Sequence, residues 1–349
     1  MREVGEVLRR ENAHRATRFP VTFVLANEPR LESLREVDPD RDLAYFRLGE
    51  RAWVLQTYLR LRGAGLPVHL AATPPDRGLV VFHAKHKHWL ARAARGRRDL
   101  VFVAIRADNS SPLLADFEVL QNDRFADGVR RFHIPFWPQP ALRRRDPNRG
   151  RRLERIGYMG LLENLHRDFR EGEWPRALAS LGLQWAPRIA QYRDKTELTQ
   201  IDWEDFRELD AVIAVRPSVR RLEFAKPASK LINAWRAGVP ALIGNEYACR
   251  AIRRSEDDYL EVNNASEALA ALTRLQSDPE LHARMITNGR RRAAEYSFDA
   301  IADVWATLLF DTLPALIDAG ALSWDRRLPL PLRLPLRRAI RILRAERSR

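Results

Sequence analysis

Two lysines four residues apart, Lys226 and Lys230, lie in a chain that otherwise relies on arginine: only five of its 60 basic residues are lysine. Pro227 disfavours helix in the residue before it and Ser229 is a favoured N-cap, so we expect a helix to begin at about Ser229. The free backbone N–H groups and the positive dipole end of such a helix start can bind a phosphate. A compact ammonium also suits a point contact to a diphosphate. The spacing therefore predicts a phosphate site, and the alternative is that the lysine stems only cover apolar surface.

The run HAKHKH at 83–88 gathers three histidines and two lysines after a predicted strand. Imidazoles bind divalent cations, so metal binding is conceivable. However, no carboxylate lies nearby in the sequence, and His83 and His86 share a face only in a helix. A single cysteine, Cys249, excludes an intramolecular disulfide and a Cys-based zinc cluster. We therefore expect a solvated basic loop around His86 and His88, and no structural zinc.

The elements that position these residues follow from the apolar pattern. In the first 140 residues, short apolar runs alternate with segments of helical spacing, which is typical of a parallel sheet covered by helices. We expect strands at 20–26, 66–70, 78–82, 100–105 and 132–135, and helices at 50–62 and 88–97. Residues 1–19 are expected to form a helix or a frayed arm, and residues 27–46 a loop.

The same alternation restarts after 141–152, a polar segment typical of a linker. We expect strands at 155–159, 211–215, 240–243 and 259–262, and helices at 174–181, 229–237, 265–276, 279–295 and 298–317. In the helix that starts at Ser229, Leu231 and Trp235 supply the buried stripe, and Gly238 ends it. The sequence thus predicts the α/β class, with two doubly wound domains in tandem and a ligand in the cleft between them, at the carboxyl ends of the strands.

The segment KPASKLINAWRAGVPALIG (226–244) resembles the donor-binding segment in the second domain of GT-B-fold glycosyltransferases, in a bacterial branch similar to families 1 and 4. The resemblance extends to DWEDFRELDAVIAVRP (202–217) and to 259–305. It is looser in the first domain, at LGERAWVLQTYLRLRGAGLPVHL (48–70) and IPFWPQPAL (134–142). It implies two Rossmann-like domains facing a cleft, and transfer of a sugar from a nucleotide diphosphate to a glycan or lipid-linked acceptor.

The resemblance also implies a domain order. It gives an acceptor domain at 1–145, a nucleotide-sugar donor domain at 153–298, a helix at 299–320 that returns to the first domain, and a basic tail at 321–349. In the donor domain, Gly160 and the turn Lys226–Lys230 would flank the diphosphate.

Two positions depart from the family pattern. Asn233 falls where many retaining members have the second Glu of a Glu-x7-Glu pair, which contacts the ribose, and Ala225 takes the place of the first Glu. An amide can still bond a ribose hydroxyl, whereas Ala225 offers a sugar no polar contact. Glu246, at the end of the strand 240–243, is an alternative polar contact.

Other candidates lie at strand ends and helix starts. In the resembled fold a polar residue at the place of His83 lies by the sugar and the acceptor, which makes His83 a candidate general base or hydrogen-bond donor to the sugar. Asp108 could face the acceptor or form a plain Asx turn. Gly49 and Arg51 open the first helix, where Arg51 could meet the diphosphate or solvate the helix end. Arg216, after a strand of the second domain, is a similar candidate.

We expect no metal and no cofactor, since the nucleotide sugar is a substrate. The DxD-type metal motif of other glycosyltransferases has no counterpart, because DPD at 38–40 matches by letters only. A basic helix start could neutralise the departing diphosphate instead. Two other interpretations stay open: a catalytically inactive GT-B-like basic binding protein, and a nucleotide-sugar epimerase on the same scaffold.

The net charge of +14 is concentrated at the C-terminus: residues 326–349 contain nine Arg and one Glu, a net of +8, which leaves +6 for the rest. This distribution argues against a nucleic-acid-binding surface. Leu336, Ile340 and Leu343 form a stripe among the arginines, which favours contact with an anionic membrane surface unless the tail is a disordered end. The charged N-terminus has no signal-peptide core, and no apolar run approaches about 18 residues. We expect a cytoplasmic protein able to lie at the inner face of the membrane.

Overall fold

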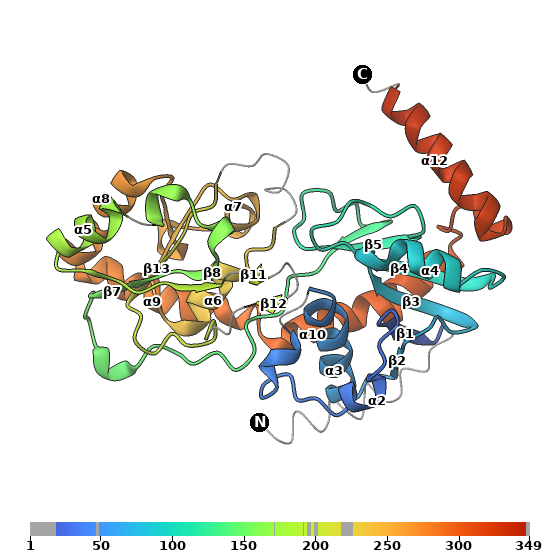
Figure 1. Ribbon diagram of the computed structural model, residues 1–349, viewed down its shortest axis with the longest axis horizontal. Coiled ribbons are helices and arrows are strands. Elements are labelled where there is room, and N and C mark those ends of the chain that lie inside the picture. The colour runs from blue at the N-terminus through green and yellow to red at the C-terminus, as the bar shows by residue number, and fades with distance from the viewer. Residues whose placement is uncertain are drawn as a thin grey trace. The chain divides into compact units, whose positions relative to one another are not determined.

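The computed structural model describes residues 19–46, 49–170, 172–190, 192–193, 197–198, 202–217 and 226–346. The chain divides into two compact units (Figure 1): unit 1 is Met1–Ile134 with Ile301–Arg349, and unit 2 is Pro135–Ala300. Ala225 and nearly all of the predicted N-terminal arm lie outside the described residues.

Unit 1 is built on a parallel six-stranded sheet in the order β2-β1-β3-β4-β5-β6. Its strands are β1 (Val21–Val24), β2 (Val68–Ala71), β3 (Arg77–His83), β4 (Asp99–Ile105), β5 (Phe117–Leu120) and β6 (Arg131–His133). Its helices before residue 134 are α2 (Leu31–Leu34), α3 (Gln56–Gly63) and α4 (Lys87–Ala93), with helical turns η1 (Leu43–Phe46), η2 (Arg51–Leu55) and η3 (Ala84–His86). All five strands predicted for this half are present.

The burial of the central strands explains why they could be predicted. In β3 and β4 every residue after the first is buried, and parallel strands covered on both faces need such continuous apolar runs. β5 was missed because Glu118 interrupts its short apolar run. The strand order changes direction between β1 and β3, which is where open α/β sheets bind ligands, and His83 ends β3 there.

A helical stretch consists of α10 (Phe298–Ala306), η9 (Thr307–Thr312) and α11 (Leu313–Asp318), and from Ile301 onward it belongs to unit 1. Ile301, Trp305, Leu309 and Leu313 recur every four residues and are at most 1% exposed, and the Trp305 ring centre lies 6.3 Å from that of Phe23 in β1. The segment Pro279–Asp318 is also long and apolar enough to cross a membrane by length and composition alone. Within this segment, the buried stripe from Ile301 to Leu313 belongs to unit 1.

Unit 2 contains a parallel five-stranded sheet in the order β15-β14-β13-β7-β9. Its strands are β7 (Arg155–Gly157), β9 (Gln184–Trp185), β13 (Ala211–Ala214), β14 (Ala241–Ile243) and β15 (Leu260–Glu261). Two further strand pairs join β8 (Met159–Leu161) to β10 (Arg188–Ala190) and β11 (Tyr192–Arg193) to β12 (Glu197–Leu198). The helices are α5 (Glu173–Ser180), α6 (Ser229–Ala237), α7 (Tyr247–Ile252), α8 (Ala265–Ser277) and α9 (Pro279–Ala294), with turns η4 (Pro147–Arg149), η5 (Leu162–Asn164), η6 (Arg167–Phe169) and η8 (Glu256–Asp258).

The main sheet of unit 2 is covered on both faces. In β13, Ala211 and Ile213 belong to one apolar cluster, whereas Val212 and Ala214 belong to another that includes Trp235 of α6. Counted from β9, its strands follow the chain order 2-1-3-4-5, the same order as the first five strands of unit 1. The α/β class with two Rossmann-like doubly wound domains is therefore confirmed.

The predicted linker at 141–152 is part of unit 2. Arg145 is 8% exposed and donates to the carboxylate of Asp210, which is completely buried, at 2.7 and 3.0 Å. Arg143 pairs with Asp205 in an isolated parallel bridge. These contacts place the unit boundary at Pro135, before the polar segment and not within it.

Candidate functional site

Three segments converge at the carboxyl ends of β7 and β13 in unit 2. The strand order changes direction between these two neighbours, so this is the point where a doubly wound sheet binds ligands. Gly160 follows β7, Arg216 follows β13, and Lys230 lies in the first turn of α6, the helix between β13 and β14. The structure therefore brings together three residues that the sequence analysis assigned to a diphosphate.

Lys230 is half-buried and lies against Tyr158. Its ammonium is 4.5 Å from the centre of the Tyr158 ring and donates to the Tyr158 hydroxyl at 3.4 Å. Burial, with the nearby charges of Arg216 and Lys226, lowers the pKa of Lys230 to about 7. Among the residues that the structure describes, no carboxylate forms an ion pair with this ammonium. Within the described part of the chain, this partly buried cation therefore has no carboxylate counterion of the kind that a buried charge normally has.

Arg216 is held by two acceptors. Its Nε donates to Oε2 of Glu246 at 3.0 Å and its Nη1 donates to Oδ1 of Asn164 at 3.0 Å. The side chains of Arg216 and Glu246 are 15% and 9% exposed. Although burial opposes the shift, the Glu246 carboxylate raises the pKa of the guanidinium. Glu246, predicted as a polar contact to the donor, therefore orients Arg216.

Gly160 leaves the space in which the lysine lies. A Cβ at this position would come 2.7 Å from Nζ of Lys230 and 2.7 Å from the hydroxyl oxygen of Tyr158. Both distances are too short for non-bonded atoms, so any larger residue would displace the ammonium. The glycine is required by this close approach.

The start of α6 differs from the prediction in one detail. The N-cap is Ala228, and no side chain caps the helix, so the predicted N-cap role of Ser229 is wrong: Ser229 is the first helical residue. The helix otherwise spans the predicted 229–237 and ends at Gly238 with φ of 74°. Because no side chain caps it, its first N–H groups are not used by a capping oxygen. Lys226 precedes the helix and contributes to the lowered pKa of Lys230.

Asn233 fixes the backbone of a preceding segment. Its Oδ1 accepts a hydrogen bond from the backbone N–H of Gln139 at 2.9 Å. Nearby, the ring of Trp137 stacks with that of Phe298 at 6.3 Å. Within unit 2, these contacts join Gln139 to α6 and Trp137 to the start of α10. A ribose contact of Asn233 stays a prediction.

In unit 1, His83 is 5% exposed at the end of β3. Its Nδ1 accepts the backbone N–H of Lys85 at 3.3 Å, and burial lowers its pKa to about 4. A neutral imidazole has one donor and one acceptor nitrogen, so Nε2 carries the proton. Nε2 is buried without a hydrogen-bond partner among the described residues, and a Cβ on Gly49 would lie 3.8 Å from it. The site therefore presents an unused N–H donor.

Two carboxylates influence His83. Asp108 accepts from Nε2 of Gln121 at 3.1 Å, and its charge favours the protonated form of His83. Glu50, which pairs with Lys85 at 3.3 Å, acts in the same direction. No carboxylate lies near the histidine run in the sequence, and Glu50 is brought to it only by the fold.

The remaining candidates are engaged within unit 1. Arg51 donates to Glu28 at 2.6 Å, with side chains 15% and 11% exposed, so this arginine is paired in the structure. Asp40 of the DPD sequence forms a two-pronged pair with Arg60, both bonds being 2.7 Å. No group of three His, Cys, Asp or Glu side chains with metal-binding spacing occurs among the described residues.

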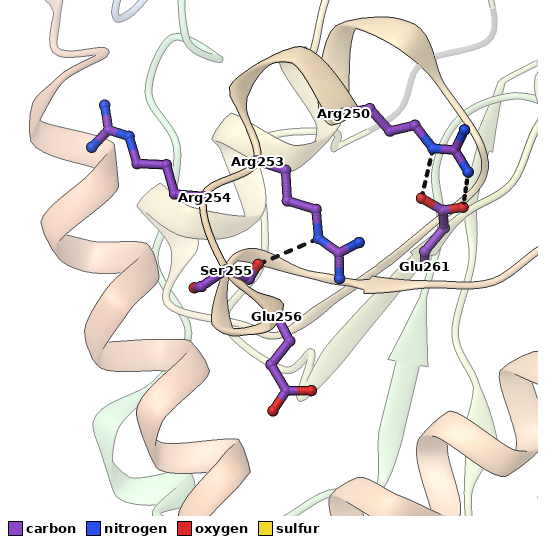
Figure 2. Close-up of a pocket in the computed structure, with 6 residues that line it drawn as sticks. All are labelled: Arg250, Arg253, Arg254, Ser255, Glu256 and Glu261. Atoms are coloured by element: carbon purple, nitrogen blue, oxygen red, sulfur yellow. Dashed lines mark hydrogen bonds and ion pairs between the residues drawn. The ribbon is translucent and has the colours of Figure 1, made fainter.

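Unit 2 also has an open pocket of about 660 Å³, lined by other residues (Figure 2). Its charges are largely satisfied internally: Arg250 donates to Glu261 at 2.8 Å, and Arg253 donates to the carbonyl of Ser255 at 3.3 Å and stacks 4.7 Å from the Tyr259 ring centre. It contains none of the predicted site residues.

Two site residues were not predicted, Tyr158 and Asn164. Tyr158 lies two residues before Gly160 at the end of a predicted strand, which is a usable signal for a side chain near the sheet's carboxyl edge. Asn164 lies in η5 and has no comparable signal.

No protein-family model and no curated protein matches the sequence. Solved structures are similar to it in fold. Sucrose-phosphate synthase from Thermosynechococcus elongatus has a TM-score of 0.53 at 14% identity, covering 85% of this chain and 100% of that one. AviGT4, a glycosyltransferase involved in avilamycin A biosynthesis, has a TM-score of 0.51 at 15% identity, covering 85% of this chain and 99% of that one. HepE from Anabaena, solved in complex with UDP and glucose, has a TM-score of 0.52 at 12% identity, covering 83% of this chain and 99% of that one. The predicted GT-B-type fold is thereby confirmed.

Proposed function

We propose that this protein is a metal-independent glycosyltransferase that moves a sugar from a nucleotide diphosphate to a hydroxyl of a glycan or lipid-linked acceptor. The observation that carries the proposal is the Lys230 ammonium, which lies at the strand switch point of unit 2 without a carboxylate partner among the described residues. An unpaired, desolvated cation is costly, which favours a site that an anion fills. The fold supports a sugar nucleotide as that anion, since HepE was solved with UDP and glucose.

The chemistry follows from where charge develops. The bond between the anomeric carbon and the diphosphate oxygen breaks, and its electron pair leaves with the diphosphate. The acceptor hydroxyl oxygen bonds to the anomeric carbon and loses its proton. Lys230 and Arg216 would donate to the leaving diphosphate, and each preorganised donor of this kind contributes about 10²–10³-fold in rate.

The metal independence rests on the same two cations. A divalent metal in a glycosyl transfer neutralises the leaving diphosphate, and an ammonium and a guanidinium at the switch point could supply that charge. We expect full turnover after treatment with EDTA and exhaustive dialysis. A strict requirement for Mg²⁺ or Mn²⁺ would contradict this part of the proposal.

In unit 1 we assign His83 to a substrate hydroxyl. Its Nδ1 is occupied by the Lys85 N–H and its Nε2 carries a proton, so it is suited to donate a hydrogen bond and not to act as a general base. Asp108 is the remaining candidate to receive the acceptor proton, although Gln121 already donates to it.

A nucleotide panel tests the proposal. We would measure the shift in melting temperature with UDP, GDP, ADP and TDP and with their sugar conjugates, then repeat the best ligand with Lys230→Ala. We expect one nucleotide to bind and the variant to lose at least about tenfold in affinity, since a hydrogen bond to a charged group contributes about 1.5–3 kcal/mol. Lys87→Ala, in unit 1, is the matched control. Undiminished affinity in Lys230→Ala would remove the diphosphate assignment.

A product assay then separates the alternatives. Sugar transfer to an acceptor or to water identifies a transferase, a changed sugar on an intact nucleotide identifies an epimerase, and tight binding without turnover identifies an inactive binding protein.

A further inference from the structure

The C-terminal helix α12 (Leu330–Glu346) has two different faces. One face packs on unit 1. Leu330 is 5% exposed and belongs to the apolar cluster around Phe102 of β4. Arg333 is 4% exposed, and its guanidinium lies 5.9 Å from the centre of the Phe102 ring. The first turns of α12 are therefore part of the core of unit 1 and not a disordered end.

An ionic anchor fixes the orientation of the helix. The carboxylate of Asp116, with a side chain only 2% exposed, accepts from Arg326 at 2.6 Å and from Arg337 at 3.0 Å. Arg337 also donates to Asp325 at 2.6 Å, and Arg341 donates to the carbonyl of Ser111 at 2.9 Å. Arginines along one side of α12 are thus used to dock it, which holds the other side away from unit 1.

The other side carries an apolar stripe. Leu332, Leu336, Ala339 and Leu343 are spaced by four, three and four residues, so they lie on one face of the helix. Leu332 and Leu343 are 59% and 58% exposed, values that are high for leucine. Trp324, in the turn η10 (Trp324–Arg327) before the helix, is 64% exposed. Figure 1 shows α12 extending beyond the sheet of unit 1 toward the C-terminus.

The size and charge of this surface restrict what can cover it. The stripe from Leu332 to Leu343 is about 16 Å long at about 1.5 Å per residue, roughly half the thickness of a bilayer's hydrocarbon core, so the helix can lie on a membrane but not cross it. The segment 326–349 has a net charge of +8. Arg338 is exposed on α12, and Arg327 is exposed just before it.

We propose that α12 docks unit 1 on a membrane surface that contains anionic lipid, with Leu332, Leu336 and Leu343 at the level of the headgroups and upper acyl chains. Anionic headgroups complement Arg338, which is exposed on α12, and Arg327, which is exposed just before it. A second copy of the chain is the competing occupant, but a symmetric pair of α12 helices would bring the exposed Arg327 and Arg338 of both copies together, with no acidic residue in the length of helix that the stripe spans. This inference does not depend on the sugar-transfer proposal.

The test is flotation of the full-length protein with vesicles. We would compare phosphatidylcholine vesicles with and without about 30% phosphatidylglycerol, for the wild type and for Leu332→Gln/Leu343→Gln. We expect binding only to the anionic vesicles and at least a tenfold lower partition coefficient for the variant. The substitutions keep the net charge and change side chains that are more than half exposed, so an unchanged melting temperature verifies the fold.

A matched control removes two exposed apolar side chains elsewhere in unit 1, as Phe125→Gln/Val129→Gln; these residues are 43% and 51% exposed. We expect this control to bind vesicles like the wild type. Equal binding by the α12 variant would show attraction by charge alone and overturn the proposal. A wild-type dimer in sedimentation velocity that the α12 variant converts to monomer would assign the stripe to a second copy instead.

Discussion

The ammonium of Lys230 lies over the ring of Tyr158, 4.5 Å from its centre, and donates to the hydroxyl that in turn donates to the carbonyl of Leu161 at 2.7 Å. An aromatic face attracts a cation but does not neutralise it. Glu246, whose charge favours the protonated form of Lys230, is engaged with Arg216. The lysine is thus retained in an environment that burial makes unfavourable for its charged form.

The first prediction concerns the pH dependence of ligand binding. A lysine is charged below its pKa, which is about 7 for Lys230 in the free protein. A bound diphosphate favours the charged form, so affinity should be greatest below pH 7 and fall as the pH rises above it. We expect the Kd of the preferred nucleotide sugar to increase about 25-fold between pH 6.5 and 8.5, since the charged fraction of a group with a pKa of about 7 falls from about 76% to about 3%. Calorimetry in two buffers should also show proton uptake on binding near pH 8.

The control for that experiment is Lys230→Arg, whose guanidinium stays charged throughout this range. It should show a flat pH profile and no proton uptake, whatever its absolute affinity. Proton uptake equal to that of the wild type would assign the titration to another group.

The second prediction is that the same lysine lowers stability. Its pKa falls from the ordinary 10.5 to about 7 on folding. Between pH 7 and 10.5 the unfolded chain therefore binds more protons than the folded chain, so Lys230 makes the free energy of unfolding rise with pH in that range. Below pH 7 the lysine is charged in both states, and its full destabilising effect is present. Lys230→Met should raise the free energy of unfolding by about 1 kcal/mol or more at pH 6, with a smaller gain at pH 9. Urea unfolding at both pH values measures this, and a less stable variant at pH 6 would contradict it.

The third prediction tests the space beside the lysine. Gly160→Ala places a methyl group 2.7 Å from the present position of the ammonium, so the side chain must move away from Tyr158. We expect about a tenfold weaker affinity for the nucleotide sugar and a lower melting temperature, because the methyl group also comes 2.7 Å from the hydroxyl of the buried Tyr158. Gly63→Ala in α3 is the matched control, because no atom lies within 4 Å of a Cβ there. Equal affinities for the two variants would show that the position of the ammonium does not matter.

The helix that carries Lys230 illustrates what the sequence could predict. Leu231 and Trp235 on one side, with a glycine at the end, are local signals, and α6 was placed to the residue. β3 and β4 were equally clear because continuous apolar runs have few other interpretations. By contrast, the terminal segment mixes leucine with proline, and its order depends on Asp116, more than 200 residues earlier in the chain. No local pattern could indicate that contact.

The residues of the candidate site also divide into those that the sequence could predict and those that it could not. Glycine, lysine and arginine at strand ends and a helix start could be predicted, because topology gathers these positions at one edge of a sheet. The pairing of Arg216 with Glu246 and Asn164 could not, since it depends on side-chain geometry between three separate segments. Likewise, Glu50 is 33 residues before His83 and reaches it only through the fold.

The fourth prediction concerns Asp210, which is completely buried and accepts from Arg145, Arg149 and the backbone N–H groups of Glu154 and Arg155. Although burial opposes the shift, these donors lower its pKa to about 2. The resulting stability is complete above the ordinary value of 3.8 and is lost as the pH falls from there toward 2. Asp210→Asn should cost about 3–5 kcal/mol at pH 7.

The control for Asp210→Asn is Glu208→Gln. This substitution breaks the ion pair between Glu208 and Arg155, in which the glutamate side chain is 62% exposed. Exposed pairs contribute little, so we expect a change within about 1 kcal/mol. Urea unfolding at pH 7 and pH 3 should show the cost of Asp210→Asn shrinking at the lower pH. A cost that stays constant would mean that the carboxylate's charge is not what stabilises unit 2.

The fifth prediction separates the two roles considered for His83. As a neutral donor with a pKa of about 4, His83 should contribute no break of its own to the pH–rate profile between pH 5 and 8, and the break near pH 7 expected from Lys230 should persist in His83→Gln. His83→Ala should lower the rate of nucleotide-sugar hydrolysis by about 100-fold while changing nucleotide affinity less than twofold, and His83→Gln, which keeps an N–H donor, should recover part of the loss. His88→Gln, an exposed neighbour in the same run, is the matched control. A break near pH 6.5 in the wild type that His83→Gln abolishes would show that the imidazole titrates as a base. Nδ1 would then accept a proton from the substrate and not the hydrogen bond from the Lys85 N–H.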